Sequence, residues 1–459
     1  EVGFDGFRLD AVKHFPPAVL NELDRQVWKS IKTPLLNGQQ QHVFSFSEMF
    51  DGNRGAVQQY IKKNANTVSG TTIGGNRDAL DFPLFFAMRD NLTANGLQND
   101  WRNVVGRSQD VQDDGLENGT QGVAFAESHD EDGVTALKRV AHAYMLMRPG
   151  NALVYFNAKE FGNGRTFPKD GELSALGGFH GSRITDLVEI RNTHGRGNYT
   201  TRLLEKEVMA YERDRSALVV LNNRGDSPVQ TRVIQTGFAP GTKLIDLTGN
   251  ATNPAIDTTG ALPDVVTIDA LGRGTFSVAG NATAQGTLTD NGYAIYGLAK
   301  PTGTLSISNI AATLNPATPT AGNNATNRLT ALPVITANAF SITLNTLPVT
   351  LPDGSRDTPA DGDNALFKFN AGLNLNGNGG VDLADDPLTG VVYGFEQFVT
   401  QRQPGYNSNP ALSGAGTYSQ SIDTTLLPEG YNYITVRAFR QRSDGGPAVF
   451  EDFRQAIYV

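Results

Sequence analysis

The chain has 459 residues, a formal net charge of −9 at pH 7 and no cysteine. Its length exceeds what one hydrophobic core usually organises, so two or three domains are expected, and the lack of cysteine excludes disulfides, thiolate chemistry and cysteine-based zinc sites. The acidic balance argues against nucleic acid or an anionic membrane as a partner, because both are bound through basic patches, and favours a neutral or polyhydroxylated ligand.

Residues 1–200 alternate short apolar runs with segments of helical periodicity. The patterns predict strands at residues 3–12, 43–46, 80–86, 122–126 and 152–156, and helices at 16–31, 56–62, 133–147 and 184–192. Such alternation implies right-handed crossovers and a parallel sheet. Five strand–helix units are countable, whereas a closed barrel of this type needs eight. We therefore predict an α/β fold in which residues 1–200 form the C-terminal part of a TIM (β/α)8 barrel.

Beyond residue 200 the helical patterns disappear. Strand-like runs at residues 208–211, 218–221, 244–247, 265–268 and 293–296 predict a small antiparallel β domain over residues 201–299. Residues 300–303, Lys-Pro-Thr-Gly, are expected to form a linker. Alternating runs between residues 306 and 458 then predict a β-sandwich accessory domain over residues 304–459.

Three of the strand-like segments in the first 200 residues end on a carboxylate, namely Asp10, Glu48 and Asp130. In a parallel barrel each strand delivers the side chain at its C-terminal end to one shared pocket, so the three acids are expected to converge. Glycoside hydrolysis needs two carboxyl groups astride the scissile bond, one protonated and one ionised. Three acids supply that pair and a helper, although a single strand-end Asp would more often be a helix cap.

The neighbours of each acid favour the catalytic interpretation. Arg8 lies two residues before Asp10, so both side chains leave the same face of a strand, where a guanidinium stabilises an ionised carboxylate. Glu48 closes the apolar run 44–46, and an apolar wall raises the pKa of a carboxyl group, as a general acid requires. His129 directly precedes Asp130, a place from which it can hydrogen-bond a sugar hydroxyl.

These segments resemble conserved regions two, three and four of the α-amylase family of glycoside hydrolases, glycoside hydrolase family 13. They read Gly-Phe-Arg-Leu-Asp-Ala-Val-Lys-His at residues 6–14, Ser-Glu-Met-Phe at 47–50 and Phe-Ala-Glu-Ser-His-Asp at 125–130, in the order that the family has. The resemblance covers about the first 300 residues, and its specificity rests on the three motifs.

The resemblance implies a role for each of these residues. Asp10 would be the nucleophile, Glu48 the general acid and then the base, and Asp130 a ligand of two hydroxyls on the sugar ring. The residues implied to bind substrate are Arg8, Lys13, His14 and His129. The implied activity is that of a retaining α-glucan hydrolase, which cleaves α-1,4-glucosidic bonds of a starch- or glycogen-like polysaccharide or oligosaccharide.

Other functions stay open at this point. An α-glucosidase or a transglycosylase of the same family would use the same acids, and the loops that separate these activities are not defined by the motifs. A carbohydrate-binding surface protein that kept the barrel and lost activity is the alternative from another class. The presence of all three acids favours the enzyme.

The sequence departs from the family at its beginning, because the first conserved region and the inserted domain that supplies most calcium ligands have no counterpart here. We therefore expect an N-terminally truncated fragment that is inactive on starch by itself. No cofactor is assigned, and a structural calcium, which needs about 6 to 8 oxygen ligands, is expected only of a longer protein. A secreted or cell-surface location is expected, and the oligomeric state is undefined. No apolar run in the sequence reaches the length of about 20 residues that a membrane span needs.

Two further sets of residues receive structural interpretations. Phe50, Trp101 and Tyr155 could stack on sugar rings, but core positions are expected for them. The acidic residues Asp353, Asp357, Asp361 and Asp363 do not have the spacing of a calcium-binding loop, and a solvated loop is expected.

Overall fold

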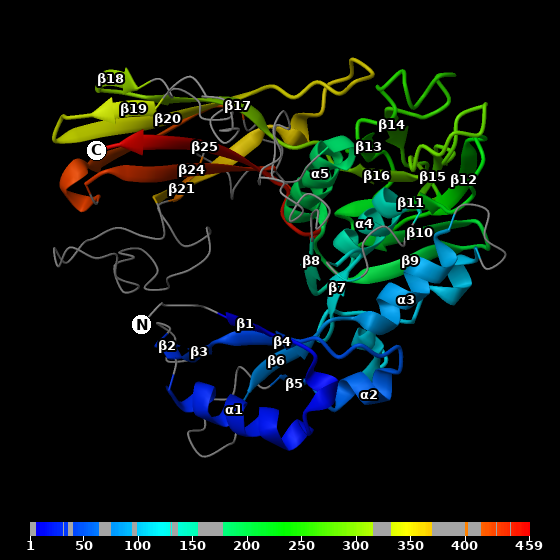
Figure 1. Ribbon diagram of the computed structural model, residues 1–459. Helices are drawn as coiled ribbons and strands as arrows, with labels where there is room; N and C mark the ends of the chain where they lie inside the picture. The colour runs from blue at the N-terminus through cyan, green and yellow to red at the C-terminus, as the bar shows by residue number, and fades with distance from the viewer. Residues whose placement is uncertain are drawn as a thin grey trace. The chain divides into compact units, whose positions relative to one another are not determined.

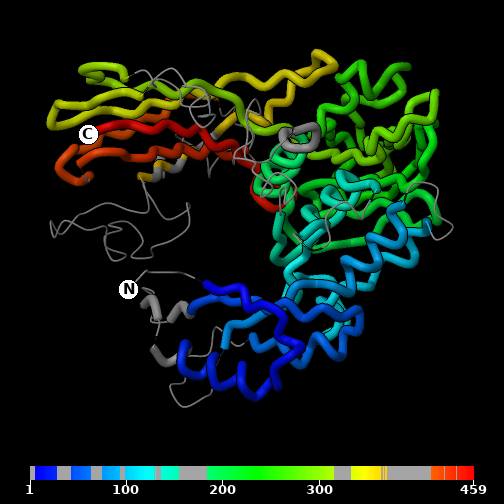
Figure 2. The backbone as a smooth tube through the Cα atoms, viewed as in Figure 1, coloured from blue at the N-terminus to red at the C-terminus, as the bar shows by residue number. Residues whose placement is uncertain are grey.

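The computed structural model describes residues 6–30, 32–34, 40–63, 75–93, 99–128, 130, 136–154, 178–314, 332–369, 400–402, 415–427, 429–440 and 442–459. The chain forms two compact units, one ending at Gly297 and the other beginning at Leu298. Figure 1 labels the helices and strands of both units, and Figure 2 traces their backbone. Among the described residues, no helix is both long and apolar enough to cross a membrane.

Five short parallel strands open the first unit. In spatial order they are β1 (Gly6–Leu9), β4 (Phe44–Ser47), β6 (Asn76–Ala79), β7 (Val123–Phe125) and β8 (Asn151–Leu153). A parallel bridge between Leu80 and Val123 connects β6 to β7. The short strands β2 (Lys32–Pro34), β3 (Gln40–His42) and β5 (Lys62–Lys63) pair antiparallel to their neighbours. Parallel strands are thus confirmed in this part of the chain.

The strand predicted at residues 80–86 is wrong. Only Leu80 takes part in sheet pairing, and helix α3 (Phe82–Asn91) begins directly after Asp81. The Asp81 carboxylate accepts a hydrogen bond from the Leu84 N–H at 3.0 Å and so caps the helix, while Pro83 fits its first turn. Helix α3 is buried on several sides, so its sequence is a continuous apolar run. Such a run has no polar positions at helical spacing, and its pattern therefore cannot be distinguished from that of a buried strand.

The other helices of the first unit follow the predicted order. They are α1 (Pro17–Ser30), α2 (Arg54–Gln58), α4 (Lys138–Met147) and α5 (Gly178–His194), with 3-10 turns η1 (Val12–His14), η2 (Trp101–Asn103) and η3 (Gln109–Gln112). The helix expected from residue 133 begins at Lys138, because residues 136 and 137 form a bend, and residues 133–135 lie outside the described residues. Helix α4 is buried along its whole length and forms the centre of the largest apolar core.

A buried ion pair attaches α1 to the parallel sheet. Arg77 on β6 is fully buried, and its Nε donates to the carboxylate of Asp24 on α1 at 3.1 Å. The same guanidinium donates to the carbonyl oxygen of Tyr60 at 2.6 Å. This ion pair fixes the position of α1 relative to the strands, along the strand direction.

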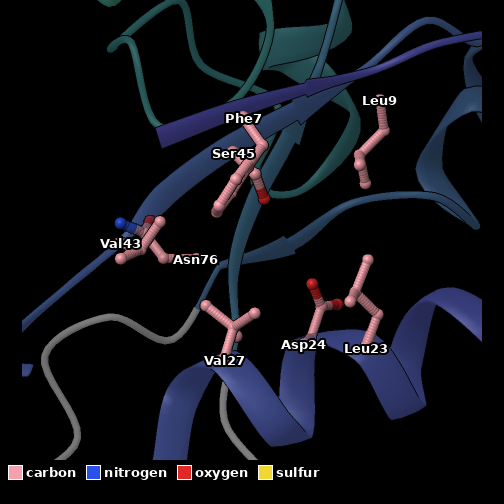
Figure 3. Close-up of a pocket in the computed structure, with 9 residues that line it drawn as sticks. Phe7, Leu9, Leu23, Asp24, Val27, Val43, Ser45 and Asn76 are labelled. Carbon is pink, nitrogen blue, oxygen red and sulfur yellow. The ribbon is translucent and has the colours of Figure 1, made fainter. Parts of the chain in front are cut away.

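An apolar pocket of about 120 Å³ lies between α1 and the strands. Figure 3 shows side chains of α1 and of the strands facing each other across it, among them Phe7, Leu9, Leu23, Val27 and Val43. Phe7 and Leu23 keep 40% and 44% of their surface exposed, so the packing here is incomplete. Because side chains alternate along a strand, this pocket lies on the face of β1 opposite to Arg8.

An antiparallel sheet completes the first unit. Its strands are β9 (Tyr199–Leu204), β10 (Val208–Arg213), β11 (Ala217–Asn222), β13 (Lys243–Asp246), β14 (Val265–Thr267) and β16 (Tyr293–Gly297), in the order β14-β13-β16-β11-β10-β9, beside the pair β12 (Gln230–Gln235) and β15 (Arg273–Val278). Buried side chains of β10, β11 and β16 share one core with α3, α4 and α5. The antiparallel strands are therefore packed onto the helices of the preceding segment.

The second unit consists of two sheets around one core. Its strands are β17 (Thr302–Ile307), β18 (Ile310–Leu314), β19 (Leu332–Ile335), β20 (Ala339–Leu347), β21 (Gly362–Phe369), β22 (Thr400–Arg402), β23 (Thr417–Asp423), β24 (Tyr431–Arg440) and β25 (Phe450–Tyr458), with 3-10 turns η6 (Thr358–Ala360) and η8 (Thr424–Leu426). The sheets β17-β20-β23 and β18-β19-β25-β24-β21-β22 both bury side chains in this core, as in a β-sandwich. The strand expected at residues 391–395 lies outside the described residues.

Two expectations for this unit are corrected. Thr302 and Gly303 do not belong to a linker, because they pair with Leu347 and Thr346 at the start of β17. Of the acidic loop, Asp353 is exposed as expected, whereas Asp357 and Asp361 are buried. Asp361 is fully buried and accepts hydrogen bonds from Arg356 at 2.6 Å and from the Val349 N–H at 2.9 Å.

The second acid of that loop is also paired, since Asp357 binds Arg440 at 3.0 Å. Arg356 within the loop and Arg440 on β24 thus pair with these two buried carboxylates, and the pairs have a structural role.

Replacement of Arg77 by Met should destabilise the first unit by about 3 to 5 kcal/mol, because the Asp24 carboxylate would stay buried without its cation. The matched control is Arg25→Met on the same helix, whose partner Glu22 is exposed, and little change is expected there. Urea unfolding followed by circular dichroism measures both. Equal losses in the two variants would contradict a special role for the buried pair.

A second prediction concerns Asp290, which caps α4 from outside the helix. Its carboxylate accepts hydrogen bonds from the N–H groups of Arg139 at 2.6 Å and Val140 at 3.2 Å. Leu137, the residue directly before the helix, supplies no side-chain cap of its own. Burial raises the pKa of Asp290 from 3.8 to about 7, against the opposing effect of these donors and of the Arg139 charge.

An acid whose pKa is higher in the folded state keeps its proton there while the unfolded chain releases it. The contribution of Asp290 to stability should therefore decrease as pH rises from about 4 to about 7, and stay constant above that range. Asp290→Asn should remove this component of the pH dependence, as measured by urea unfolding at a series of pH values. A slope that is the same in wild type and variant would contradict the assignment.

Candidate active site

The C-terminal ends of the five parallel strands surround one pocket of about 150 Å³. Its lining residues are Arg8 of β1, Glu48 after β4, Leu80 after β6, Phe125 of β7 and Leu153 of β8, together with Phe82 and Ser128. Each of the five strands thus contributes a side chain from its C-terminal end. This is the location at which sheets of parallel strands commonly gather reactive groups.

The guanidinium of Arg8 joins two of the three acids. One terminal nitrogen donates to Oδ1 of Asp10 at 2.8 Å, and the other donates to Oε2 of Glu48 at 2.5 Å. The planar fork of an arginine holds two carboxylates in fixed positions better than a lysine would. Arg8 and Glu48, which are 40 residues apart in sequence, are thereby brought together. The motif analysis predicted that Asp10 and Glu48 would likewise meet.

Backbone pairing continues beyond the strand ends and fixes these side chains. The Glu48 N–H donates to the carbonyl oxygen of Leu9 at 2.8 Å, and the Val12 N–H donates to that of Glu48 at 3.1 Å. Between these bonds, Ala11 adopts a left-handed conformation with φ of 46°, which is strained for a residue with a side chain.

Close approach of β1 and β4 explains a glycine in the first motif. A Cβ added to Gly6 would collide with the carbonyl oxygen of Phe44 on β4. Glycine therefore allows the register that places Leu9 opposite Ser47 and Arg8 opposite Phe46.

The two paired acids lie in unlike surroundings. Glu48 is buried, with 8% of its surface exposed, whereas the side chain of Asp10 is 71% exposed. Burial raises the pKa of Glu48, and a hydrogen bond with the Asp10 carboxyl raises it further, while the Arg8 charge and the Ala11 N–H oppose this rise.

Aromatic rings form the apolar side of the pocket. Phe82 and Phe125 lie 5.0 Å apart between ring centroids, and Phe85 stacks on Phe125 at 4.7 Å. These residues were not identified from the sequence as part of the site, since an aromatic residue at the end of a strand or the start of a helix is equally expected in any core. The removal of water by this wall is the physical cause of the raised pKa of Glu48.

The third acid lies on the turn after β7. Asp130 is exposed, and its N–H donates to Oγ of Ser128 at 3.3 Å. Ser128 lines the pocket but Asp130 is not among the lining residues, so the convergence of this third acid with the other two stays a prediction. His129 lies outside the described residues.

Lys13 and His14 follow on the 3-10 turn η1, where both are exposed. The Nζ atom of Lys13 lies 5.0 Å from the ring centroid of Phe50. Phe50 packs on Phe82 at 4.9 Å but keeps 38% of its surface exposed, so the expected core position for Phe50 is wrong.

For the two other aromatic residues, the outcomes differ. The core position of Trp101 is confirmed by its complete burial, and Tyr155 lies outside the described residues. Within the part of the chain that is described, no group of three or more His, Asp or Glu residues is arranged to hold a metal ion.

Replacement of Arg8 by Met should raise the pKa of Glu48 further, because the Arg8 charge lowers it in the wild type. Arg8→Lys keeps the charge and should give a smaller rise. A carbon-13 NMR titration of the glutamate carboxyl signals, with Glu48→Gln to assign the resonance, measures the change. An unshifted pKa in Arg8→Met would contradict the contact described above.

No family model matches the chain. Curated relatives do match. The glucan 1,4-α-maltohexaosidase of Bacillus sp. (strain 707) is 24% identical over 292 residues, which cover 62% of this chain and 49% of the relative. α-Amylase 2 of Schwanniomyces occidentalis is 24% identical over 266 residues, which cover 53% of this chain and 46% of the relative.

Solved structures of α-amylases are also similar. That from Malbranchea cinnamomea gives a TM-score of 0.43 at 15% identity and covers 64% of this chain and 56% of its own. Wild-type α-amylase I from Eisenia fetida gives 0.39 at 18% identity, with 64% and 62% covered. The chain spans about half the length of the two curated relatives. The curated relatives confirm the resemblance to the α-amylase family of glycosidases.

Proposed function

We propose that this chain, a relative of the α-amylases, supplies the catalytic carboxylates of a retaining hydrolase that cleaves α-1,4-glucosidic bonds in α-glucans. The observation that carries the proposal is the pair of Asp10 and Glu48 held on one guanidinium at the ends of two adjacent parallel strands. Curated relatives named as an α-amylase and a maltohexaosidase support the choice of substrate.

The unlike surroundings of the two acids support distinct roles. Glu48, buried against aromatic rings and with a raised pKa, is suited to carry the proton of a general acid. Asp10, exposed and hydrogen-bonded to Arg8, is suited to attack the anomeric carbon. As the Asp10 oxygen bonds to that carbon, the bond to the leaving oxygen breaks and the Glu48 proton moves to it. Water then attacks the same carbon and gives its proton to Glu48, while the bond between that carbon and the Asp10 oxygen breaks and releases Asp10 as a carboxylate.

The closeness of the two carboxyl groups supports retention of configuration. Inverting glycosidases separate their carboxyl groups by about 6.5 to 9.5 Å to admit a water molecule, and retaining ones by about 5 to 5.5 Å. Asp10 and Glu48 are held on one guanidinium, at 2.8 and 2.5 Å, and this shared contact keeps the two carboxyl groups near each other, which supports the retaining class.

The remaining residues complete the proposed site. Asp130 and His129 would bind hydroxyls of the sugar ring in the cleavage subsite, next to Ser128. Lys13 and His14 would contact the glucan on the reducing-end side. The exposed ring of Phe50 under Lys13 offers a surface there for a sugar.

The five parallel strands fit the last five of a (β/α)8 barrel, with the pocket at its C-terminal rim. In this proposal residues 1–200 are the catalytic part, residues 201–299 the small β domain and residues 304–459 an accessory domain. A secreted or cell-surface location fits a polymeric substrate that does not enter cells.

The test compares Glu48→Gln and Asp10→Asn with wild type, in the protein expressed from its whole coding sequence, by release of reducing ends from soluble starch. Each variant should lose at least about 100-fold in kcat, because general acid catalysis alone contributes about 10²–10⁴-fold. Exposed Glu22 on α1 provides the control, and Glu22→Gln should match wild type. Proton NMR should show the α-anomer as the first product.

Two outcomes would refute the roles. One is a loss below tenfold in either variant while the control stays active, and the other is a β-anomer as first product. The pH profile gives an independent check. Because Glu48 must carry a proton, kcat/KM should fall as pH rises through its raised pKa.

A further inference from the structure

We propose that Ala11 is a positioning residue of the candidate active site, because it forms a one-residue β-bulge directly after Asp10 and so fixes Asp10 next to Glu48. Ala11 itself does not touch the substrate and acts only through these two acids. Its effect on catalysis rests on the proposed function, whereas the bulge is a property of the backbone and can be measured without substrate.

Backbone hydrogen bonds locate the bulge between β1 and β4, which Figure 1 shows side by side. The N–H of Glu48 donates to the carbonyl oxygen of Leu9 at 2.8 Å. In a regular parallel ladder, the carbonyl oxygen of Glu48 would then accept from the residue two positions after Leu9, which is Ala11. It accepts instead from the N–H of Val12 at 3.1 Å. Two residues, Asp10 and Ala11, therefore lie opposite Glu48 where a regular ladder has one, and this arrangement is a β-bulge.

The backbone conformation of Ala11 is that of a bulge residue. Its φ of 46° and ψ of 39° are left-handed. In one common type of bulge a residue takes this conformation, and that residue is a glycine. Asn and Asp also tolerate it, because their short polar side chains can hydrogen-bond locally, whereas alanine has no such compensation. Strain of this kind persists only where the surrounding structure enforces it, and it is concentrated at functional sites.

The bulge reverses the alternation of side chains along the strand. Arg8 and Asp10 lie on the face that carries the acids, and strict alternation would place Val12 there as well. Val12 instead is 1% exposed and belongs to the apolar cluster against which Leu9, from the opposite face, is packed. The extra residue has therefore moved an apolar side chain from the acid side into the core.

Val12 and Lys13 have different environments because of this reversal. The buried side chain of Val12 and its hydrogen bond to Glu48 hold the chain, directly after Asp10, against the strand that precedes Glu48. Lys13 is exposed, and its Nζ lies 5.0 Å from the ring centroid of Phe50. A cation, and not the apolar side chain of Val12, therefore follows Asp10 on the exposed side.

The bulge also affects the proton affinity of Glu48. Burial and a hydrogen bond with Asp10 raise the pKa of Glu48, and the Arg8 charge lowers it. The Ala11 N–H acts in the same direction as Arg8. Because Val12 occupies the ladder position of Ala11, this N–H is left out of the pairing of the two strands. Loss of the bulge should return it to the ladder, and the pKa of Glu48 should then rise further.

Three substitutions at position 11 test the assignment, in the protein expressed from its whole coding sequence. Ala11→Val introduces a β-branched side chain, which does not tolerate the left-handed conformation. Ala11→Asn is of similar size and tolerates it, and Ala11→Gly adopts it freely. On soluble starch, Ala11→Val should lose about tenfold or more in both kcat and kcat/KM, because even a small misplacement of reacting groups is costly. Ala11→Asn and Ala11→Gly should retain most of the wild-type kcat.

Two measurements without substrate report on the bulge itself. Carbon-13 NMR should show a higher pKa of Glu48 in Ala11→Val than in Ala11→Asn. Urea unfolding should give decreasing stability in the order Ala11→Gly, wild type, Ala11→Val. An ordinary strand position has the opposite order, since β-branched residues favour strands and glycine weakens them. If Ala11→Val does not fold, Ala11→Leu replaces it, because leucine has nearly the shape of asparagine without its polar group.

Ala18→Val on α1 is the matched control, since Ala18 is exposed and this variant should keep the wild-type kcat. A loss in Ala11→Asn as large as that in Ala11→Val would overturn the assignment, because side-chain size and not backbone conformation would then be the cause. A stability order typical of a strand, or wild-type kcat in folded Ala11→Val, would overturn it as well.

These outcomes are separate from those of the hydrolase test. Wild-type activity of Glu48→Gln and Asp10→Asn would refute the proposed function, and the NMR and unfolding measurements would still decide whether Ala11 positions the two acids. Conversely, if both acids prove essential and folded Ala11→Val keeps full activity, only the role of Ala11 is refuted.

Discussion

The contact of the Arg8 guanidinium with Asp10 and Glu48 is the interaction on which the candidate site depends. Burial against Phe82 and Phe125 favours the protonated form of Glu48, and the guanidinium opposes that effect. The balance leaves the pKa of Glu48 raised, and its partner Asp10 is exposed. An acid and a nucleophile side by side are the minimal requirement of glycoside hydrolysis by double displacement.

The rest of the first unit maintains that arrangement. The strand that carries Arg8 pairs with the strand that precedes Glu48, and α1 is fixed beneath them by the buried pair of Arg77 and Asp24. Further along, α4 packs against both the parallel strand β7 and the antiparallel sheet, and Asp290 of that sheet's connection caps it. The antiparallel strands therefore support the parallel ones through a shared core.

The second unit is built on a different principle, in which strand alternation separates a packed inner face from an outer face. Buried arginine–aspartate pairs such as Arg440 with Asp357 fix its loops. On the outer face of β24 and β25 this alternation leaves Tyr431 and Tyr433 in solvent, while Ile434 and Val436 fill the core.

Local patterns in the sequence determined the parallel strands, the order of the helices, and the pairing of Arg8 with Asp10, because a spacing of two residues fixes which side chains share a strand face. They also indicated Glu48 as a buried acid, since an apolar run precedes it. Only the tertiary structure decided what depends on distant contacts. Arg440 pairs with Asp357, 83 residues away, and buries that acid, and Phe50 stays exposed beneath Lys13. In both cases the deciding partner lies far away in the sequence, and a periodicity measured over neighbouring residues carries no information about it. The Asp81 cap of α3 and the pair of Arg356 with Asp361 are local, but hydrophobic periodicity does not record hydrogen-bonding groups.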